Sequence, residues 1–326
     1  MNEEGIADLD YFVDLQPKKE DFHEAVLRGL SLPQKSISPK FFYDEKGSKI
    51  FDKICEAPEY YVTRTEIAIL NDIKKEIYSV VEPGSVVVEY GCGSSIKIKA
   101  LLSALPDPSH YIAIDISKSH LIATAKEIAS DYLNISVGAI CADFLEPIDW
   151  PEKAFSKSSN RLAFFPGSTI GNQIPSEAGQ FMKYVRHMVG DEGFFLVGVD
   201  LKKDIKILDR AYNDAAGFTA DFNCNLLHRM KNELDAELNI SNFSHNAFYN
   251  EVLGRVEMHL VSDIQQMIRI DDVDFSFEKG ESIHTENSYK YSKKEFAELA
   301  KKSGFGLLKS WSDVENFFCI YLMKAI

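Results

Sequence analysis

Five short apolar runs alternate with amphipathic segments in the middle of the chain. The runs are SVVVEY (85–90), YIAID (111–115), ISVGAI (135–140), RLAFFP (161–166) and FFLVGV (194–199). Each run has the length of one strand, and apolar strands that alternate with helices are typical of a parallel sheet covered on both faces. The alternation therefore predicts a doubly wound, Rossmann-like α/β fold.

The segments on either side of this alternation have a different character. Residues 18–54 predict an irregular arm with two helices, and a further helix is expected to begin near Thr65, where apolar residues recur at helical spacing. After Asp200, a helical region (203–236) leads into three strand-like segments, RVEMHLVS, QQMIRI and FSFEKG, which are followed by ESIHTENSYKY. The chain then returns to one helix, KKEFAELAKKSG, and two strands, LLKSW and FFCIYLMKA.

These changes of pattern predict two parts. We expect residues 65–200 plus 291–326 to form a cofactor-binding core. We expect residues 1–64 plus 201–290 to form a second α+β domain that binds the substrate. The first of these parts carries the α/β alternation, and the second contains the arm and an insertion with its own β structure.

The composition indicates which kinds of molecule the protein is expected to bind. The 326 residues are 45% hydrophobic and carry a formal net charge of −14, which disfavours nucleic acid and anionic membranes and favours a small-molecule substrate. The five cysteines are scattered, with no C-x-x-C pair and no His at metal-ligand spacing, so we expect reduced thiols and no metal. The acidic start and the lack of a long apolar run predict a cytoplasmic protein. No obligate protein partner is indicated.

A glycine loop follows the first strand of the alternation. Gly91 and Gly93 in VVVEYGCGSSIK lack a Cβ, so the backbone can approach a ligand at the start of the next helix. Alone, the pattern fits an ordinary strand-to-helix turn equally well. A dinucleotide site would have a third glycine where this chain has Ile96, which disfavours a nicotinamide cofactor.

Polar and aromatic residues follow the next two strands. Asp115 closes the second strand, where its carboxylate can accept hydrogen bonds from two ribose hydroxyls or can cap a helix. Asp143 and Phe144 follow the third strand and suit an adenine amino group and the face of the base, or a turn and a core aromatic. Because the carboxyl ends of neighbouring parallel strands meet in one crevice, these residues together favour S-adenosylmethionine (SAM). The closing pair of antiparallel strands is typical of the methyltransferase variant of this fold.

Longer motifs outside the glycine loop resemble one family. They are FFYDEKGSKIFDKI, APEYYVTRTE, GSTIGN, RAYNDAAGFTADFN, RVEMHL and TENSYKY, and they resemble the histidine N-α-methyltransferase family of ergothioneine biosynthesis over nearly the whole chain. The resemblance implies a class I SAM-dependent fold, SAM as cofactor and S-adenosylhomocysteine as product. It also implies that the α-amino group of free L-histidine is trimethylated to hercynine.

The resemblance implies a set of carboxylate-binding residues. Tyr60, Asn172 and Tyr212 match positions of the family that hold the carboxylate of the amino acid. Three neutral donors can bind an anion, which agrees with that role. The alternative is that the tyrosines lie at the edge of the core and that Asn172 is a turn residue.

A second set is implied for the imidazole. Glu286 and Ser288 match the family's imidazole contacts, and their spacing of two on a strand points both side chains to one face. A carboxylate and a hydroxyl can bind the two ring nitrogens and reject apolar side chains, which would leave both polar groups unpaired. Met258 matches a methionine that lines the same pocket. The alternatives are an exposed polar edge and, for Met258, a plain core residue.

The remaining implied residues lie near the reacting atoms. Tyr43 and Phe51 match residues beside the reacting nitrogen and the cofactor, and aromatic faces suit a quaternary ammonium product. Gly167 would bring its carbonyl close to the amine. Lys97 matches a lysine near the cofactor, although a solvated helix lysine is an equal alternative.

The implied mechanism is an in-line displacement by a neutral amine. It needs no covalent intermediate, and Tyr43 or Asn172 would assist loss of the proton to solvent. Cys92 is unusual for the glycine loop of the family. No His that could activate it is visible nearby in the sequence, so nothing indicates that Cys92 is a nucleophile. Two other functions remain open: a methyltransferase for another small amine or amino acid, and a catalytically silent SAM-binding protein.

Overall fold

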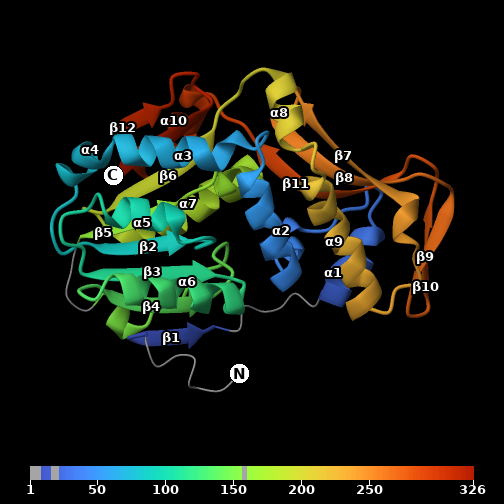
Figure 1. Ribbon diagram of the computed structural model, residues 1–326, viewed down its shortest axis with the longest axis horizontal. Helices are drawn as coiled ribbons and strands as arrows, with labels where there is room; N and C mark the ends of the chain where they lie inside the picture. Colours follow the sequence, from blue (N-terminus) through green and yellow to red (C-terminus); the bar gives the residue numbers. More distant parts are fainter. Residues whose placement is uncertain (1–8, 16–21, 156–159) are drawn as a thin grey trace. The chain divides into compact units, whose positions relative to one another are not determined.

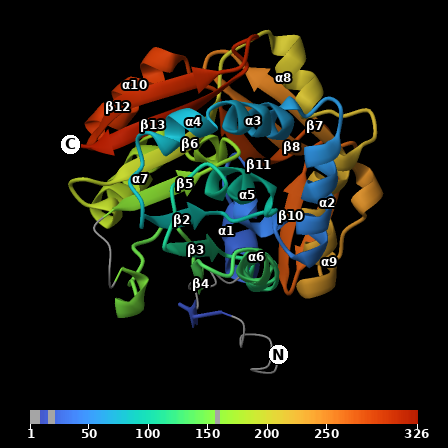
Figure 2. The same ribbon diagram turned by 60° about the vertical axis from the view of Figure 1, so that its left-hand side comes forward.

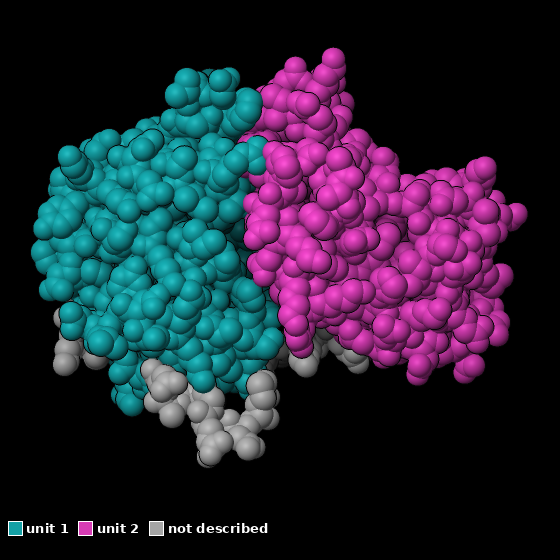
Figure 3. All heavy atoms as spheres, in the orientation of Figure 1, with its two compact units in different colours: residues 1–17, 62–202, 290–326 teal, residues 18–61, 203–289 magenta. Residues whose placement is uncertain are grey.

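The computed structural model describes residues 9–15, 22–155 and 160–326 and divides into two compact units (Figure 3). Unit 1 consists of Met1–Pro17, Val62–Lys202 and Lys290–Ile326, and unit 2 consists of Lys18–Tyr61 and Lys203–Tyr289. The chain therefore leaves the first unit and returns to it twice.

Unit 1 contains an eight-stranded sheet (Figure 1). Its order is β1 (Tyr11–Asp14), β4 (Ser136–Cys141), β3 (His110–Asp115), β2 (Val86–Tyr90), β5 (Arg161–Phe165), β6 (Phe194–Asp200), β13 (Phe318–Ala325) and β12 (Phe305–Ser312). The strands from β1 to β6 are parallel, and β13 is antiparallel to both of its neighbours. The five strands expected from the apolar runs are confirmed to within one residue at each end.

Helices of unit 1 cover this sheet (Figure 2). They are α3 (Tyr61–Asp72), α4 (Lys74–Tyr78), α5 (Ile96–Leu102), α6 (Lys118–Asp131), α7 (Pro175–Val189) and α10 (Lys293–Lys302), with short 3-10 helices η3 (Glu152–Ala154) and η4 (Thr169–Asn172). Helix α6 packs on β3 and β4, and α7 packs on β5 and β6. The helix expected from Thr65 begins at Tyr61 and is interrupted at Ile73.

Strand β1 was not expected from the sequence. It pairs in parallel with β4, and Asp10 accepts hydrogen bonds at Oδ2 from the Val137 backbone N–H and the Ser136 hydroxyl. The Tyr11 ring lies over Gly138, where a Cβ would overlap it. Residues 9–15 therefore belong with the sheet of unit 1 and not, as the sequence suggested for residues 1–64, with the second part.

Unit 2 combines helices with a small antiparallel sheet (Figure 1). The sheet has the order β11 (Ser282–Tyr289), β8 (Arg255–Ser262) and β7 (Phe243–Asn250), and a separate hairpin joins β9 (Gln266–Ile270) to β10 (Val273–Phe277). The helices are α1 (Phe22–Leu30), η2 (Pro39–Phe42), α2 (Glu45–Glu56), α8 (Ile205–Ala211), α9 (Phe218–Glu233) and η5 (Ile240–Asn242). Helix α9 packs on α2 and on β7 and β8.

The helical region expected over residues 203–236 is divided between α8 and α9. The break ends at Gly217, which has a φ of +78°. Asp214 caps the start of α9, because its carboxylate oxygens accept hydrogen bonds from the backbone N–H groups of Phe218 and Thr219. Among the described helices, none is both long and apolar enough to cross a membrane.

Candidate functional site

The glycine loop of unit 1 bends sharply after β2. Gly91 and Gly93 have φ values of +71° and +34°, a region that favours glycine. The Gly91 N–H donates to the carbonyl of Ile114 on β3 at 2.8 Å. A Cβ at Gly93 would meet only the Gly91 oxygen, at 3.9 Å, so a ligand can approach the backbone there.

Side chains from β3 and from the segment after β4 lie beside this loop. The Asp115 carboxylate accepts from the Ser117 N–H at 2.8 Å and from the Cys92 thiol at 3.9 Å. Burial raises the pKa of Asp115. A Cβ added to Gly91 would lie 3.7 Å from the Phe144 ring. These groups fit the adenosine part of SAM: a carboxylate for the ribose hydroxyls, an aromatic face for the base and open backbone between them.

Asp143 and Cys92 have local partners. Asp143 Oδ1 accepts from the Leu145 N–H at 3.1 Å, a contact within its own turn. Burial, followed by the neighbouring Asp115, raises the pKa of the Cys92 thiol well above its ordinary value. Cys92 therefore stays protonated and lacks the thiolate character that a nucleophile needs.

Glu89, the residue two positions before Gly91, was not expected from the sequence to belong to the site. Its side chain is buried, with 1% of the residue exposed, and Tyr111 donates to its Oε2 at 2.6 Å. Among the residues that the structure describes, none forms a hydrogen bond with Glu89 Oε1. Burial raises the pKa of this carboxyl group well above its ordinary value. A buried carboxyl group with such an oxygen is well suited to bind a cation. In the sequence, the signal that could have indicated Glu89 is an acidic residue inside an apolar strand.

A second buried carboxylate holds the loop at Gly167. Both carboxylate oxygens of Glu66 accept from the Gly167 N–H, at 2.9 and 3.1 Å, and Glu66 forms an ion pair of 2.8 Å with Lys97. The Glu66 side chain is fully buried, and 14% of the Lys97 side chain is exposed. The alternative that Lys97 is a solvated helix lysine is therefore wrong, whereas its role toward the cofactor stays a prediction.

Asn172 ends the GSTIGN motif in unit 1. The motif forms a tight turn in which Ser168 has a φ of +60°, and the Asp200 N–H donates to the Ser168 hydroxyl at 2.9 Å. Asn172 is the last residue of η4 and is half-buried. Asn172 therefore lies in unit 1, whereas Tyr60 and Tyr212 lie in unit 2.

Aromatic side chains of unit 2 form one cluster. Tyr43 and Phe51 lie 5.7 Å apart between ring centroids, Phe51 and Tyr60 lie 6.4 Å apart, and Tyr60 and Tyr212 lie 6.3 Å apart. Phe222 of α9 contacts Tyr43 and Phe51, at 5.4 and 5.7 Å. The structure therefore brings together four predicted residues and adds Phe222, which lies in the motif RAYNDAAGFTADFN but was assigned no role from the sequence.

Burial determines the protonation of Tyr60. Burial, with Tyr212 as the next cause, raises the pKa of the Tyr60 phenol well above its ordinary value. Tyr60 therefore keeps its proton and acts as a neutral hydrogen-bond donor.

The predicted imidazole-binding residues lie on one face of the small sheet. Glu286 and Ser288 of β11 pair with Met258 and Val256 of β8. They are 8% and 3% exposed, so the alternative of an exposed polar edge is wrong. The Tyr212 hydroxyl donates to the Ser288 Oγ at 2.7 Å, which joins the aromatic cluster to this face.

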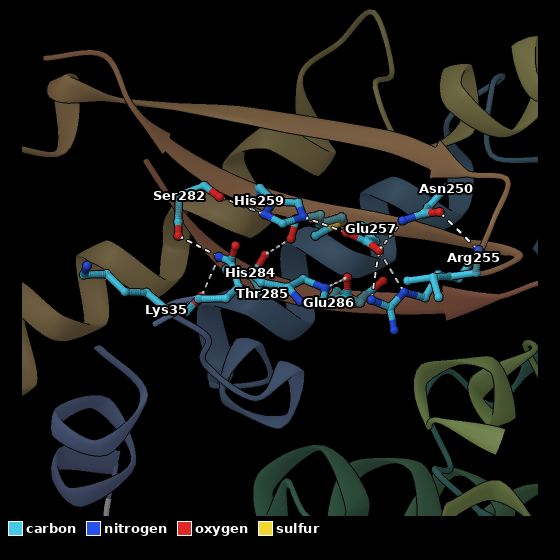
Figure 4. A network of polar contacts seen from close by, with 12 residues as sticks. Lys35, Asn250, Arg255, Glu257, His259, Ser282, His284, Thr285 and Glu286 are labelled. Atoms are coloured by element: carbon cyan, nitrogen blue, oxygen red, sulfur yellow. Dashed lines mark hydrogen bonds and ion pairs between the residues drawn. The ribbon is translucent and has the colours of Figure 1, made fainter. Parts of the chain in front are cut away.

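The opposite face of the same sheet carries Glu257, His259 and His284 (Figure 4). Their potential ligand atoms lie within 4.8 Å of one another, a grouping that the sequence spacing did not indicate. Glu257 forms an ion pair of 2.8 Å with Arg255, and its Oε2 lies 3.0 Å from His259 Nε2. The carboxylate thus already has a cation and an imidazole as partners, and the absence of a metal stays a prediction.

The fold and the glycine loop define the class of protein. A parallel sheet closed by one antiparallel strand, β13, beside β6, with an Asp at the end of β3 and glycines after β2, is that of a class I SAM-dependent methyltransferase. The family model described as "Histidine-specific methyltransferase, SAM-dependent" matches residues 22–325. The chain belongs to this family.

Named relatives agree with this membership. Proteins named "Histidine N-alpha-methyltransferase" from Mycobacterium tuberculosis and Mycolicibacterium smegmatis are each 35% identical over 302 residues, 91% of this chain and 92% of theirs. "Ergothioneine biosynthesis protein 1" of Neurospora crassa is 28% identical over 290 residues, which cover 87% of this chain and 32% of that protein.

Proposed function

We propose that this enzyme transfers three methyl groups from SAM, one at a time, to the α-amino nitrogen of free L-histidine, giving hercynine and S-adenosylhomocysteine. The observation that carries the proposal is the buried pair Glu286 and Ser288, adjacent to the aromatic cluster of unit 2. The names of the mycobacterial relatives support histidine as the acceptor, and the name of the Neurospora relative supports a place in ergothioneine biosynthesis.

Recognition of the imidazole follows from the hydrogen-bonding capacity of the pair. A neutral imidazole has one N–H donor and one acceptor nitrogen. Glu286 would accept from the N–H. The Ser288 hydroxyl accepts from Tyr212, and a hydroxyl that accepts one hydrogen bond still has a hydrogen to donate to the second nitrogen. An apolar side chain would offer neither buried group a hydrogen-bond partner, which is a strong basis for rejection.

The aromatic cluster and the neutral donors suit the backbone end of the amino acid. Tyr60, Asn172 and Tyr212 would donate to the carboxylate, with the single hydrogen of the Tyr212 hydroxyl turned from Ser288 to the substrate, and Met258 would line the pocket. The rings of Tyr43 and Phe51 would lie against the amine as methylation turns it into a permanent cation, for which aromatic faces are favourable.

Cofactor binding is assigned to unit 1. Gly91 and Gly93 would bring the backbone to the ligand, Asp115 would bind the ribose, and Asp143 and Phe144 would bind adenine. Glu89 would face a positive group, and Lys97 would act through Glu66 and Gly167. When bound, SAM supplies an electrophilic methyl group on a sulfonium.

The amine must be neutral for each transfer, so a proton leaves in every round. Tyr43 or Asn172 would orient the amine as this proton passes to solvent. The partner that we propose is the small molecule alone, with neither nucleic acid nor a membrane surface, and the proposed location is the cytoplasm.

The test is mass spectrometry of L-histidine incubated with SAM and the protein. We expect a gain of three methyl groups on the α-nitrogen, and an increase in the KM for histidine in Glu286→Gln. The matched control is Glu315→Gln, which changes an exposed glutamate of unit 1. Accumulation of only mono- or dimethylhistidine would overturn trimethylation.

Parallel assays with other amino acids and amines test the acceptor. Faster turnover of another acceptor than of histidine would support a different methyltransferase. Tight SAM binding without turnover of any acceptor would support a silent SAM-binding protein.

A further inference from the structure

One residue decides which face of the small sheet Glu286 occupies. Strands β11 and β8 pair residue by residue, with His284 opposite His259 and Glu286 opposite Met258. Thr285 therefore has no counterpart on β8, and the register shifts at this point. An extra residue in one strand of an antiparallel pair is a β-bulge, which re-aims the side chains that follow it.

The change of face can be read from the pairing. Ile283, before the bulge, lies opposite Leu260, and Glu286, after it, lies opposite Met258. Leu260 and Met258 are two residues apart and share a face of β8, whereas Ile283 and Glu286 are three residues apart on β11. Without the bulge, Ile283 and Glu286 would point to opposite faces. The extra residue thus places Glu286, and Ser288 after it, on the face that holds Met258.

A buried hydrogen-bond pair holds the bulge. The Thr285 hydroxyl lies 2.8 Å from Asn223 Oδ1 and 3.0 Å from the Met258 carbonyl, both of which accept (Thr285 and Glu286 are labelled in Figure 4). Asn223, on α9, donates through Nδ2 to the His259 carbonyl at 3.0 Å. Both Thr285 and Asn223 are buried. The amide of Asn223 therefore binds both strands at the position where their register changes.

The same amide is connected to Tyr212. Asn223 Nδ2 donates to His245 Nδ1 at 2.9 Å, and His245 Nε2 donates to the Tyr212 carbonyl at 2.9 Å. One asparagine thereby links the bulge before Glu286 to the backbone of the tyrosine that contacts Ser288.

We propose that Thr285 and Asn223 are positioning residues that set acceptor specificity: they hold the bulge that turns Glu286 and Ser288 toward the acceptor. The inference rests on the proposed function, because it needs Glu286 to bind the imidazole. Neither residue touches the substrate. Their effect reaches it through the direction of two other side chains.

The test compares Thr285→Val with Thr285→Ser. Valine keeps the shape and strand propensity of threonine but removes the hydroxyl, and serine restores the hydroxyl. We expect Thr285→Val to raise the KM for L-histidine about ten-fold, because a buried hydrogen bond is lost and Asn223 Oδ1 loses its donor. We expect kcat/KM for histidine relative to L-phenylalanine to fall, the KM for SAM to stay unchanged, and Thr285→Ser to restore the ratio.

The matched control is Ser262→Ala, at the far end of β8. It removes another buried hydroxyl of unit 2, which donates to the Ile264 carbonyl at 2.8 Å. We expect it to lower the free energy of unfolding without changing the histidine-to-phenylalanine ratio.

The outcomes separate this inference from the proposed function. If Glu286→Gln weakens histidine binding but Thr285→Val leaves both the KM and the ratio unchanged, the positioning role is wrong and the proposed function stands. If Ser262→Ala changes the ratio as much as Thr285→Val, the effect is general destabilisation and the positioning role is again wrong. If the wild-type protein methylates another acceptor in preference to histidine, the proposed function fails first.

Discussion

The hydroxyl of Tyr212 donates a hydrogen bond of 2.7 Å to the Oγ of Ser288. Tyr212 follows α8 and Ser288 lies on β11, so this bond joins two elements 76 residues apart in the chain. It also joins the residue proposed for the carboxylate of histidine to one proposed for its imidazole. The two ends of the proposed acceptor site are thus oriented together.

We therefore expect Tyr212→Phe to weaken histidine binding. The variant removes the hydroxyl whose one hydrogen bonds Ser288 in the structure and would be donated to the carboxylate when histidine binds, so the KM for histidine should rise by about ten-fold. Steady-state kinetics with histidine and SAM varied separately measure the effect. Tyr132→Phe, which loses a longer bond to the Lys99 carbonyl in unit 1, is the control. Equal effects of the two variants would contradict the expectation.

Breaking the ion pair between Lys97 and Glu66 should strongly destabilise the protein. Lys97→Met leaves a fully buried carboxylate without its cation, a change that typically costs about 3–5 kcal/mol of unfolding free energy. Urea denaturation measures it. Lys309→Met is the control, because its ion pair with Glu76 is much more exposed and should contribute little to the free energy of unfolding. Similar losses in both variants would show that the Glu66 pair contributes no more than a surface pair.

The stability of unit 2 should depend on pH through His245. Burial lowers the pKa of this imidazole, against smaller opposing effects of its bond to the Tyr212 carbonyl and of Asp214. A proton on Nδ1 would also face the donating amide of Asn223. The unfolded chain, with a His pKa of about 6.5, therefore binds the proton more readily. This part of the stability is complete above pH 6.5 and is lost as the pH falls from there toward the lower folded pKa.

Urea denaturation of the wild type and His245→Gln at pH 7.5 and 5.5 tests this dependence. The difference in unfolding free energy between the two proteins should be larger at pH 7.5. His187→Gln, at an exposed position of α7, is the control. A difference that is the same at both pH values would contradict the role of His245.

Binding of SAM should release protons from Glu89. Burial raises the pKa of this carboxyl group, and a cationic ligand near its unpaired oxygen would favour the ionised form. Titration calorimetry in two buffers of different ionisation enthalpy measures the protons released. We expect less release with S-adenosylhomocysteine, which lacks the sulfonium charge. We expect none in Glu89→Gln, and release that persists in this variant would assign the protons to another group.

The local sequence pattern was sufficient to predict most strands of the large sheet. The strands β2 to β6 are apolar on both faces, so each is visible without knowledge of its neighbours. Strands β1 and β7 were missed for a physical reason. Strand β1 has only four residues, and β7 is exposed at many positions, so both depend on a paired strand that the sequence does not reveal.

Some features of the candidate site could likewise be predicted from the sequence, and others could not. The spacing of Glu286 and Ser288 predicted a shared face correctly, because both residues lie after the bulge. The bulge itself could not be predicted, since it is defined by pairing with β8. Glu66 and Phe222 lie on helices, and the sequence does not indicate which residues they contact. The residues that the longer motifs implied await tests of their roles.

The bulge at Thr285 also bears on how such a site can change over generations. The bulge takes up one extra residue, so loss of the Thr285 codon would leave Glu286 two positions after Ile283 and still opposite Met258. The length of β11 can therefore change by one residue here without replacing the side chains that face the acceptor.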